Sequence, residues 1–220
     1  MPIVLDLRER LSHAGIPLVH PTSEHVVLAN VFGTVKNFSV DVVINPWLEM
    51  VTQTESIRAS DWKFSFWGKQ QKPIGPVGEG STEVDLILES SRSLVFAEVK
   101  MDAEPSQGTR SDPERNQLLR NLDIGYRRAR QVEKAFALVY VTPDASEPDI
   151  VARLRTEPRT FPANADLDWQ KISACLFWSS WSLIGNVVAD SYIAGKLDSV
   201  EQKFSLDLLA YLCGGDSGRW

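Results

Sequence analysis

Hydrophobic and polar residues repeat in this chain with two periods, which together predict an α/β protein. Alternation with a period of two, typical of strands, occurs at 62–67 (WKFSFW), 82–89 and 93–100. Two further apolar stretches, 135–141 (AFALVYV) and 172–181, are also expected to contain strands. Helical spacing or helix-capping residues mark 5–17, 21–39, 113–132, 148–156, 183–193 and 199–215. Asp112 followed by Pro113 predicts the cap and first turn of the helix at 113–132. Segment 39–51 fits a helix by length, but Pro46 and its β-branched residues oppose one.

Strands separated by helical stretches predict an α/β domain. We treat residues 1–220 as a single domain, with a core at about 20–141 and an extension at 142–220. The first fifteen residues carry two acids and two arginines and do not resemble a signal peptide. No segment approaches the roughly 18 apolar residues that span a bilayer. The sequence therefore predicts a cytoplasmic protein that does not contact membranes.

The segment 82–100 (TEVDLILESSRSLVFAEVK) places charged residues inside two otherwise apolar strands. A turn centred on Ser91–Arg92 sets Asp85 opposite Glu98, two pairs beyond Ile87 and Phe96 and on the same face of the hairpin. The other face of this hairpin is wholly apolar, with Val84, Leu86, Leu88, Val95, Ala97 and Val99. Opposed residues have Cβ atoms roughly 4.5–5.5 Å apart, so the two carboxylates repel each other. A bound divalent cation would remove that conflict.

Lys100 follows Glu98 by two residues and is expected on the same face of the strand. An ammonium beside a metal ion can stabilise a phosphoryl transition state or orient the attacking water. The simpler alternative is an amphipathic hairpin whose charges are solvated.

These residues resemble the PD-(D/E)XK, or restriction-endonuclease-like, nuclease superfamily. Asp85 matches its first acid, and Glu98 and Lys100 match its E-x-K motif, while Val84 stands where the motif's name has proline. The segments FWGKQQ and FWSSW are also similar to those of a bacterial subset of this superfamily. The resemblance implies a mixed central sheet flanked by helices, and Mg²⁺ as cofactor, with Mn²⁺ able to replace it.

The resemblance implies two further site residues. Many members use a glutamate on a preceding helix, and Glu24 matches that residue as a third metal ligand. Alternatively, Glu24 is simply a favourable acid at a helix N-terminus. Some members place a glutamine after the E-x-K motif, and Gln117 matches that residue as an auxiliary catalytic group, although it also fits a solvated helix position.

Basic residues offer contacts to a nucleic acid. Lys69 and Lys72 lie in or beside a glycine-rich stretch, and Arg110, Arg115 and Arg120 lie in or before a locally basic helix; a charged helix face is also often simply solvated. The net charge of −6 opposes tight, non-specific DNA binding. The tryptophans in apolar segments are predicted to be core residues: Trp62, Trp67, Trp178 and Trp181.

The leading prediction is a nuclease that hydrolyses phosphodiester bonds in DNA with Mg²⁺-activated water. Asp85, Glu98 and Glu24 would bind the metal, and Lys100 and Gln117 would act beside it. A second hypothesis is a catalytically inactive, nuclease-like binding or assembly module, which the negative net charge favours. A third is a sheet protein with an exposed charged hairpin and an unrelated ligand. A homodimer or another protein partner is compatible with all three.

Overall fold

The computed structural model describes residues 24–70, 82–101, 116–156 and 168–213. The helix expected at 5–17 and the residues Lys72, Arg110 and Arg115 lie outside the described residues. The elements are α2 (Glu24–Val35), α3 (Ile44–Thr52), a 3₁₀ turn η1 (Glu55–Ile57), β1 (Lys63–Gln70), β2 (Thr82–Glu89), β3 (Ser93–Val99), α4 (Gln117–Gln131), β4 (Ala135–Thr142), α5 (Asp149–Thr156), α6 (Trp169–Ser173), β5 (Leu176–Ser180), α7 (Trp181–Ile193) and α8 (Ser199–Cys213).

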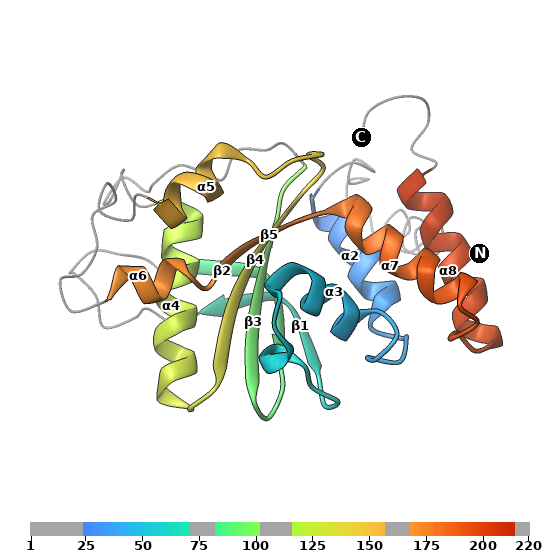
Figure 1. Cartoon of the computed structure of the whole chain (residues 1–220), viewed down its shortest axis with the longest axis horizontal. Helices are drawn as coiled ribbons and strands as arrows, with labels where there is room; N and C mark the ends of the chain where they lie inside the picture. The colour runs from blue at the N-terminus through green and yellow to red at the C-terminus, as the bar shows by residue number, and fades with distance from the viewer. Residues whose placement is uncertain (1–23, 71–81, 102–115, 157–167, 214–220) are drawn as a thin grey trace, which may run out of the picture.

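A five-stranded mixed sheet forms the centre of the protein, with its strands in the order β1-β2-β3-β4-β5. The pairs β1–β2 and β2–β3 are antiparallel, whereas β3–β4 and β4–β5 are parallel. Parallel neighbours need a crossover connection, and α4 lies in the connection between β3 and β4. Helices α4, α5 and α6 lie on one side of the sheet and α2, α3, α7 and α8 on the other (Figure 1). The α/β prediction is confirmed, and the sheet is open and mixed.

Each face of the sheet packs against its own apolar cluster. Val95, Ala97 and Val99 face the cluster formed with α2, α3 and α7, whereas Leu94 and Phe96 face the cluster formed with α4. The period-two alternation of the sequence therefore predicts both faces of β3. The expected face of β2 is confirmed at Leu86 and Leu88, but wrong at Val84, which packs with Ile87 in the α4 cluster. The alternation of β2 thus slips around Asp85.

Two helix starts are decided by local contacts of the backbone and side chains. Segment 39–51, where length favours a helix and Pro46 opposes one, contains α3; Pro46 lies in its first turn, where a backbone N–H has no partner inside the helix. Helix α4 begins at Gln117, because the Asn116 side chain accepts the Leu119 N–H at 3.0 Å and caps the helix. The expected cap at Asp112, followed by Pro113, is wrong for this helix, and both residues lie outside the described ranges.

None of the helices within the described ranges is long and apolar enough to cross a membrane.

Gly125 allows α4 to approach β4 closely. A Cβ atom at this position would lie 2.2 Å from two ring carbons of Phe136 and 3.0 Å from Phe96, and these two rings already pack edge to face. We expect Gly125→Ala to destabilise the protein by about 1–3 kcal/mol, because the rings must shift within a packed core. Urea denaturation followed by circular dichroism measures the change.

Gly33→Ala is the matched control, because a Cβ at this α2 position meets no described atom within 4 Å. Alanine in a helix interior is favoured over glycine by roughly 0.5–1 kcal/mol, so this variant should gain stability. A gain of stability in both variants to the same extent would show that helix propensity, and not the close approach of α4 to β4, governs Gly125.

Candidate active site

The β2–β3 hairpin has the register that the sequence predicts. Ile87 pairs with Phe96 and Leu86 pairs with Ala97, so continuation by one residue sets Asp85 against Glu98. Ser90 closes the turn: its backbone N–H donates to Ser93 O at 2.9 Å, and its hydroxyl accepts the Ser93 N–H at 2.9 Å. The expected juxtaposition of the two acids therefore follows from the fold of the hairpin.

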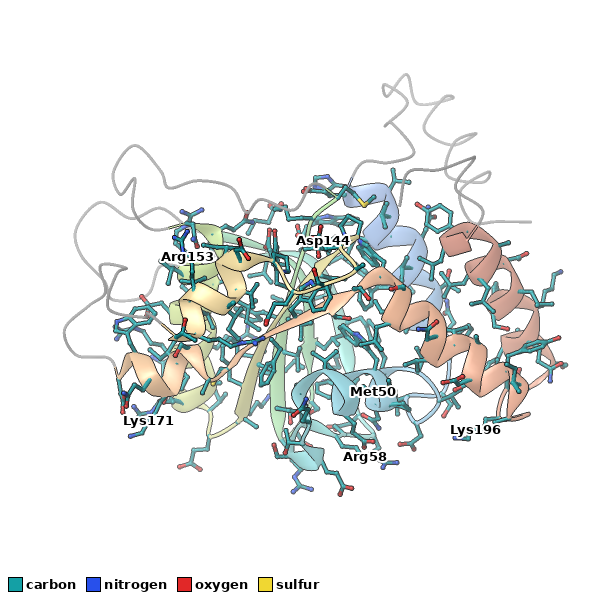
Figure 2. The ribbon with its side chains drawn as sticks, turned by 45° about the horizontal axis from the view of Figure 1, so that its top comes forward. Met50, Arg58, Asp144, Arg153, Lys171 and Lys196 are labelled. Carbon is teal, nitrogen blue, oxygen red and sulfur yellow. The ribbon has the colours of Figure 1, made fainter. Side chains whose placement is uncertain are left out.

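Next to this pair, the Asp85 side chain takes the place of a backbone acceptor in the hydrogen bonding between β2 and β3. Asp85 Oδ2 accepts the Val99 N–H at 2.8 Å. The following N–H, of Lys100, donates to Val141 O of β4 at 2.9 Å. The Asp85 carboxylate is therefore fixed between β2 and β3, beyond the Leu86–Ala97 pair. Asp144, just after β4, lies at this edge of the sheet, whereas Met50 and Arg58 lie toward the opposite edge (Figure 2).

Glu98 is the centre of the cluster and is fully buried, with 0% of its surface exposed. Its Oε1 accepts a hydrogen bond from Lys100 Nζ at 2.7 Å, and its Oε2 accepts one from Asn121 Nδ2 of α4 at 3.0 Å. The Thr82 hydroxyl in turn donates to Asn121 Oδ1 at 3.0 Å and fixes the orientation of that amide. Both oxygens of the buried carboxylate are thus held from different elements.

Lys100 connects this centre to α2. Besides Glu98, its ammonium donates to Glu24 Oε2 at 3.2 Å and to Val99 O at 3.1 Å. Three acceptors match the three N–H bonds of an ammonium group. Glu24, the first residue of α2, thereby joins Asp85, Glu98 and Lys100 in one cluster, as the sequence predicts.

The acids in this cluster are electrostatically disfavoured. Burial raises the pKa of Glu98 to about 8, and repulsion from Asp85 adds to it, against the attraction of Lys100. Burial also raises the pKa of Asp85, despite the Val99 hydrogen bond. For Lys100 burial acts against the charged form, but attraction to Glu98, Asp85 and Glu24 outweighs it and raises the pKa. Added positive charge would therefore be stabilising between the two acids.

The donor set fits a hard divalent cation. Asp85 and Glu98 supply carboxylate oxygens, the ligands that Mg²⁺ takes in proteins. Within the residues that the structure describes, no group of three or more His, Cys, Asp or Glu side chains is arranged to hold a metal ion. Lys100 Nζ instead lies within hydrogen-bond distance of both Glu98 and Glu24. Metal binding by Glu24 stays a prediction.

Asn121 and Thr82 are site residues that the sequence analysis missed. Asn121 is 0% exposed and lies among the apolar positions of α4, between Leu118 and Leu122. A polar residue within the apolar stripe of a helix was the available signal. Gln117, the predicted auxiliary group, lies one turn before Asn121 in the first turn of α4, and Asn121 is the residue that contacts Glu98.

The basic side chains of α4 are largely engaged within the protein. Arg127 pairs with buried Asp123, and Arg128 and Lys134 both pair with Glu89 of β2. Arg120 lies in the first turn of α4, and Lys69 belongs to β1; their contacts to a nucleic acid stay predictions.

The raised pKa of Glu98 predicts how stability depends on pH in the metal-free protein. The folded state keeps the proton up to about pH 8, whereas the unfolded state loses it near the ordinary glutamate pKa of 4.5. Stability is therefore highest below the unfolded pKa and falls as the pH rises through the folded one, by about 1 kcal/mol per pH unit for one proton. Urea denaturation in EDTA between about pH 5 and pH 9 measures this slope.

Glu98→Gln is the control for this slope, because glutamine keeps the shape of the side chain and does not titrate. We expect the variant to lose most of the slope and to be more stable than the original protein near pH 8. Burial also raises the pKa of Asp85, which acts in the same direction, so a residual slope in the variant is compatible with this result. An unchanged slope would contradict the assignment to Glu98.

Comparisons of this chain with protein-family models, with curated proteins and with solved structures found no match. The geometry and electrostatics of the cluster formed by Asp85, Glu98, Lys100 and Glu24 therefore carry the functional argument.

Proposed function

We propose that this protein is a metal-dependent nuclease of the PD-(D/E)XK superfamily that hydrolyses phosphodiester bonds in DNA. The observation that carries the proposal is the fully buried Glu98 beside Asp85, with the Lys100 ammonium 2.7 Å from its carboxylate. Strongly perturbed acids that converge at one edge of a sheet are typical of catalytic sites. The mixed sheet, with the acids on β2 and β3 and a glutamate at the start of α2, supports the same family.

Each residue of the cluster has a chemical role in this proposal. Asp85 and Glu98 would bind Mg²⁺, with Glu24 as a third carboxylate. The bound ion would supply positive charge to the phosphate and lower the pKa of a water molecule. In the reaction the attacking water gives up a proton to solvent and its oxygen bonds to phosphorus. The bond from phosphorus to the leaving sugar oxygen breaks, and that oxygen takes up a proton from solvent. Lys100 would orient the water or stabilise the negative charge on the phosphate oxygens.

Asn121 would act as a positioning residue. Its amide holds Glu98 Oε2 while the Thr82 hydroxyl holds the amide. A protonated carboxyl group keeps an acceptor oxygen, so the fixed Asn121 amide can donate to Glu98 Oε2 whether Glu98 is charged or protonated. Such a partner suits a glutamate that changes its charge when a cation binds.

A second candidate is an inactive binding or assembly module that keeps this fold. The observation that favours it is the position of Lys100, whose ammonium already joins Glu98 to Glu24 and neutralises part of their charge. The net charge of −6 points the same way. A module of this kind would neither bind Mn²⁺ at Asp85 nor cleave DNA.

Substitution of Lys100 tests catalysis. We expect Lys100→Met to lower the rate of Mg²⁺-dependent cleavage of a labelled DNA oligonucleotide by about 100-fold or more, because a preorganised charge at the phosphate is lost. Circular dichroism checks that the variant is folded. The matched control is Lys134→Met, which breaks the ion pair with Glu89 at the other end of the hairpin and should leave the rate unchanged. Equal rates in the original protein and Lys100→Met would refute the catalytic role.

Calorimetric titration with Mn²⁺ tests the metal site and separates the two candidates. We expect binding heat at pH 7 that is lost in Asp85→Asn, a variant whose amide oxygen can still accept the Val99 N–H. Binding should also release protons, because burial keeps Glu98 protonated up to about pH 8. Titrations in two buffers of different ionisation enthalpy measure that release. Absence of heat in the original protein would favour the inactive module.

A further inference from the structure

Trp67 lies next to the candidate active site and differs from the buried tryptophans of this protein. The sequence-based expectation that Trp67 belongs to the core is wrong: it is 38% exposed. Trp62, at the start of the same segment, is 8% exposed, and its indole N–H donates to Asn45 Oδ1 at 2.9 Å. Trp62 therefore has the packing and the hydrogen bond of a structural tryptophan, whereas Trp67 presents apolar surface to solvent.

The backbone of Trp67 is also unusual. The β1–β2 pairing includes Phe66–Leu86 and Gly68–Val84, so Trp67 lies opposite Asp85 between these two pairs. Its φ angle is +52°, in the left-handed region that is rarely occupied by a bulky residue. Strained conformations of this kind concentrate at functional sites, because the surrounding structure must hold them in place. Here the strain coincides with the strand position nearest to the first acid of the cluster.

The Trp67 ring is oriented by a residue from α2. The ring centroids of Trp67 and His25 are 5.7 Å apart, with an angle of 32° between the ring planes. His25 follows Glu24 directly in α2, and the Glu24 carboxylate accepts a hydrogen bond from Lys100 Nζ at 3.2 Å. The aromatic pair of Trp67 and His25 therefore borders the acid cluster on the side of β1 and α2.

We propose that Trp67 is the platform on which the nuclease stacks an unpaired base next to the phosphate that it cleaves. This inference rests on the proposed function and specifies its substrate as single-stranded DNA or a strand whose base is splayed out. In a duplex both faces of an internal base are covered by its neighbours, so only an unpaired or terminal base can offer a face to Trp67. Stacking on aromatic side chains gives affinity without sequence specificity.

The charge distribution of the protein agrees with this mode of binding. Proteins that bind DNA chiefly through phosphates are usually basic, whereas this chain has a net charge of −6. Arg127 and Arg128 of α4, and Lys134 just after it, are held by Asp123 and Glu89 of the same protein. Stacking at Trp67 supplies binding energy that does not depend on those cations.

Fluorescence anisotropy of a labelled single-stranded DNA 12-mer tests the inference. The measurement uses the full chain with Ca²⁺ as the divalent ion, and a gel after each titration checks that the DNA is intact. We expect Trp67→Ala to weaken binding by about 10-fold. The affinity of Trp67→Phe, which keeps an aromatic ring, should lie between those of the original protein and Trp67→Ala. Tyr192→Ala is the control, because Tyr192 is 37% exposed and belongs to the last turn of α7. Lys196, just after this helix, lies far from Asp144 (Figure 2).

An abasic scan distinguishes stacking from a structural role of Trp67. Removing the base that stacks on Trp67 should lower the affinity of the original protein by about as much as Trp67→Ala does. The same abasic DNA should bind to the Trp67→Ala variant almost as tightly as the intact DNA does. The inference is overturned if, at every abasic position, the loss of affinity from the missing base adds to the loss from Trp67→Ala. Unchanged affinity in Trp67→Ala, or tighter binding of the matched duplex, would also overturn it.

The two proposals fail in different ways in these experiments. Cleavage with unchanged affinity in Trp67→Ala would overturn the stacking platform and leave the nuclease intact. Binding that depends on Trp67 without cleavage in Mg²⁺ or Mn²⁺ would overturn the nuclease and support the platform. A protein that neither binds the 12-mer nor cleaves it overturns both.

Discussion

The burial of the Glu98 carboxylate is the constraint on which the site depends. A charged group without contact to water is tolerated only when it is paired and hydrogen-bonded, or when it takes up a proton. Lys100 and Asn121 supply the partners of Glu98, and through Glu24 and Thr82 the chain of polar contacts runs from α2 through the sheet to α4. The two apolar clusters on either side of the sheet are thus joined at one edge by hydrogen bonds and ion pairs.

The opposite end of the same hairpin shows what an ion pair with a structural role looks like here. Glu89 is partly exposed and pairs with Lys134 and Arg128. Burial opposes its charge, but the two cations outweigh burial and lower the pKa of its carboxyl group. At Glu98 the balance is reversed, since complete burial and the neighbouring Asp85 outweigh Lys100 and raise the pKa. The same residue types thus stabilise the hairpin at one end, whereas at the other end the acids would be stabilised by additional positive charge.

The sequence predicted what depends on period and register, and failed where tertiary packing decides. The pairing of Ile87 with Phe96, and the approach of Asp85 to Glu98, follow from alternation and from the position of the turn. Asn121 could not be placed from the hairpin, because its contact with Glu98 depends on how α4 packs across β3. The start of α4 was misplaced because Asp112 followed by Pro113 and Asn116 are both good capping signals. Trp67 has a left-handed backbone conformation, which neither the residue type nor the neighbouring sequence indicates, so its exposure could not be predicted.

The departures from regular structure are concentrated at the same edge of the sheet. Gln53 and Glu133 also have positive φ angles, but both follow a helix C-terminus, where such conformations are common. Among the non-glycine residues of the described ranges, Trp67 is the one whose positive φ no helix end explains. The slipped alternation at Val84, the side-chain bond from Asp85 to the backbone and the buried Glu98 all lie in β2 and β3, the next two strands of the sheet. Proteins break local rules mainly where function requires it, so this clustering favours a chemical role over a purely structural one.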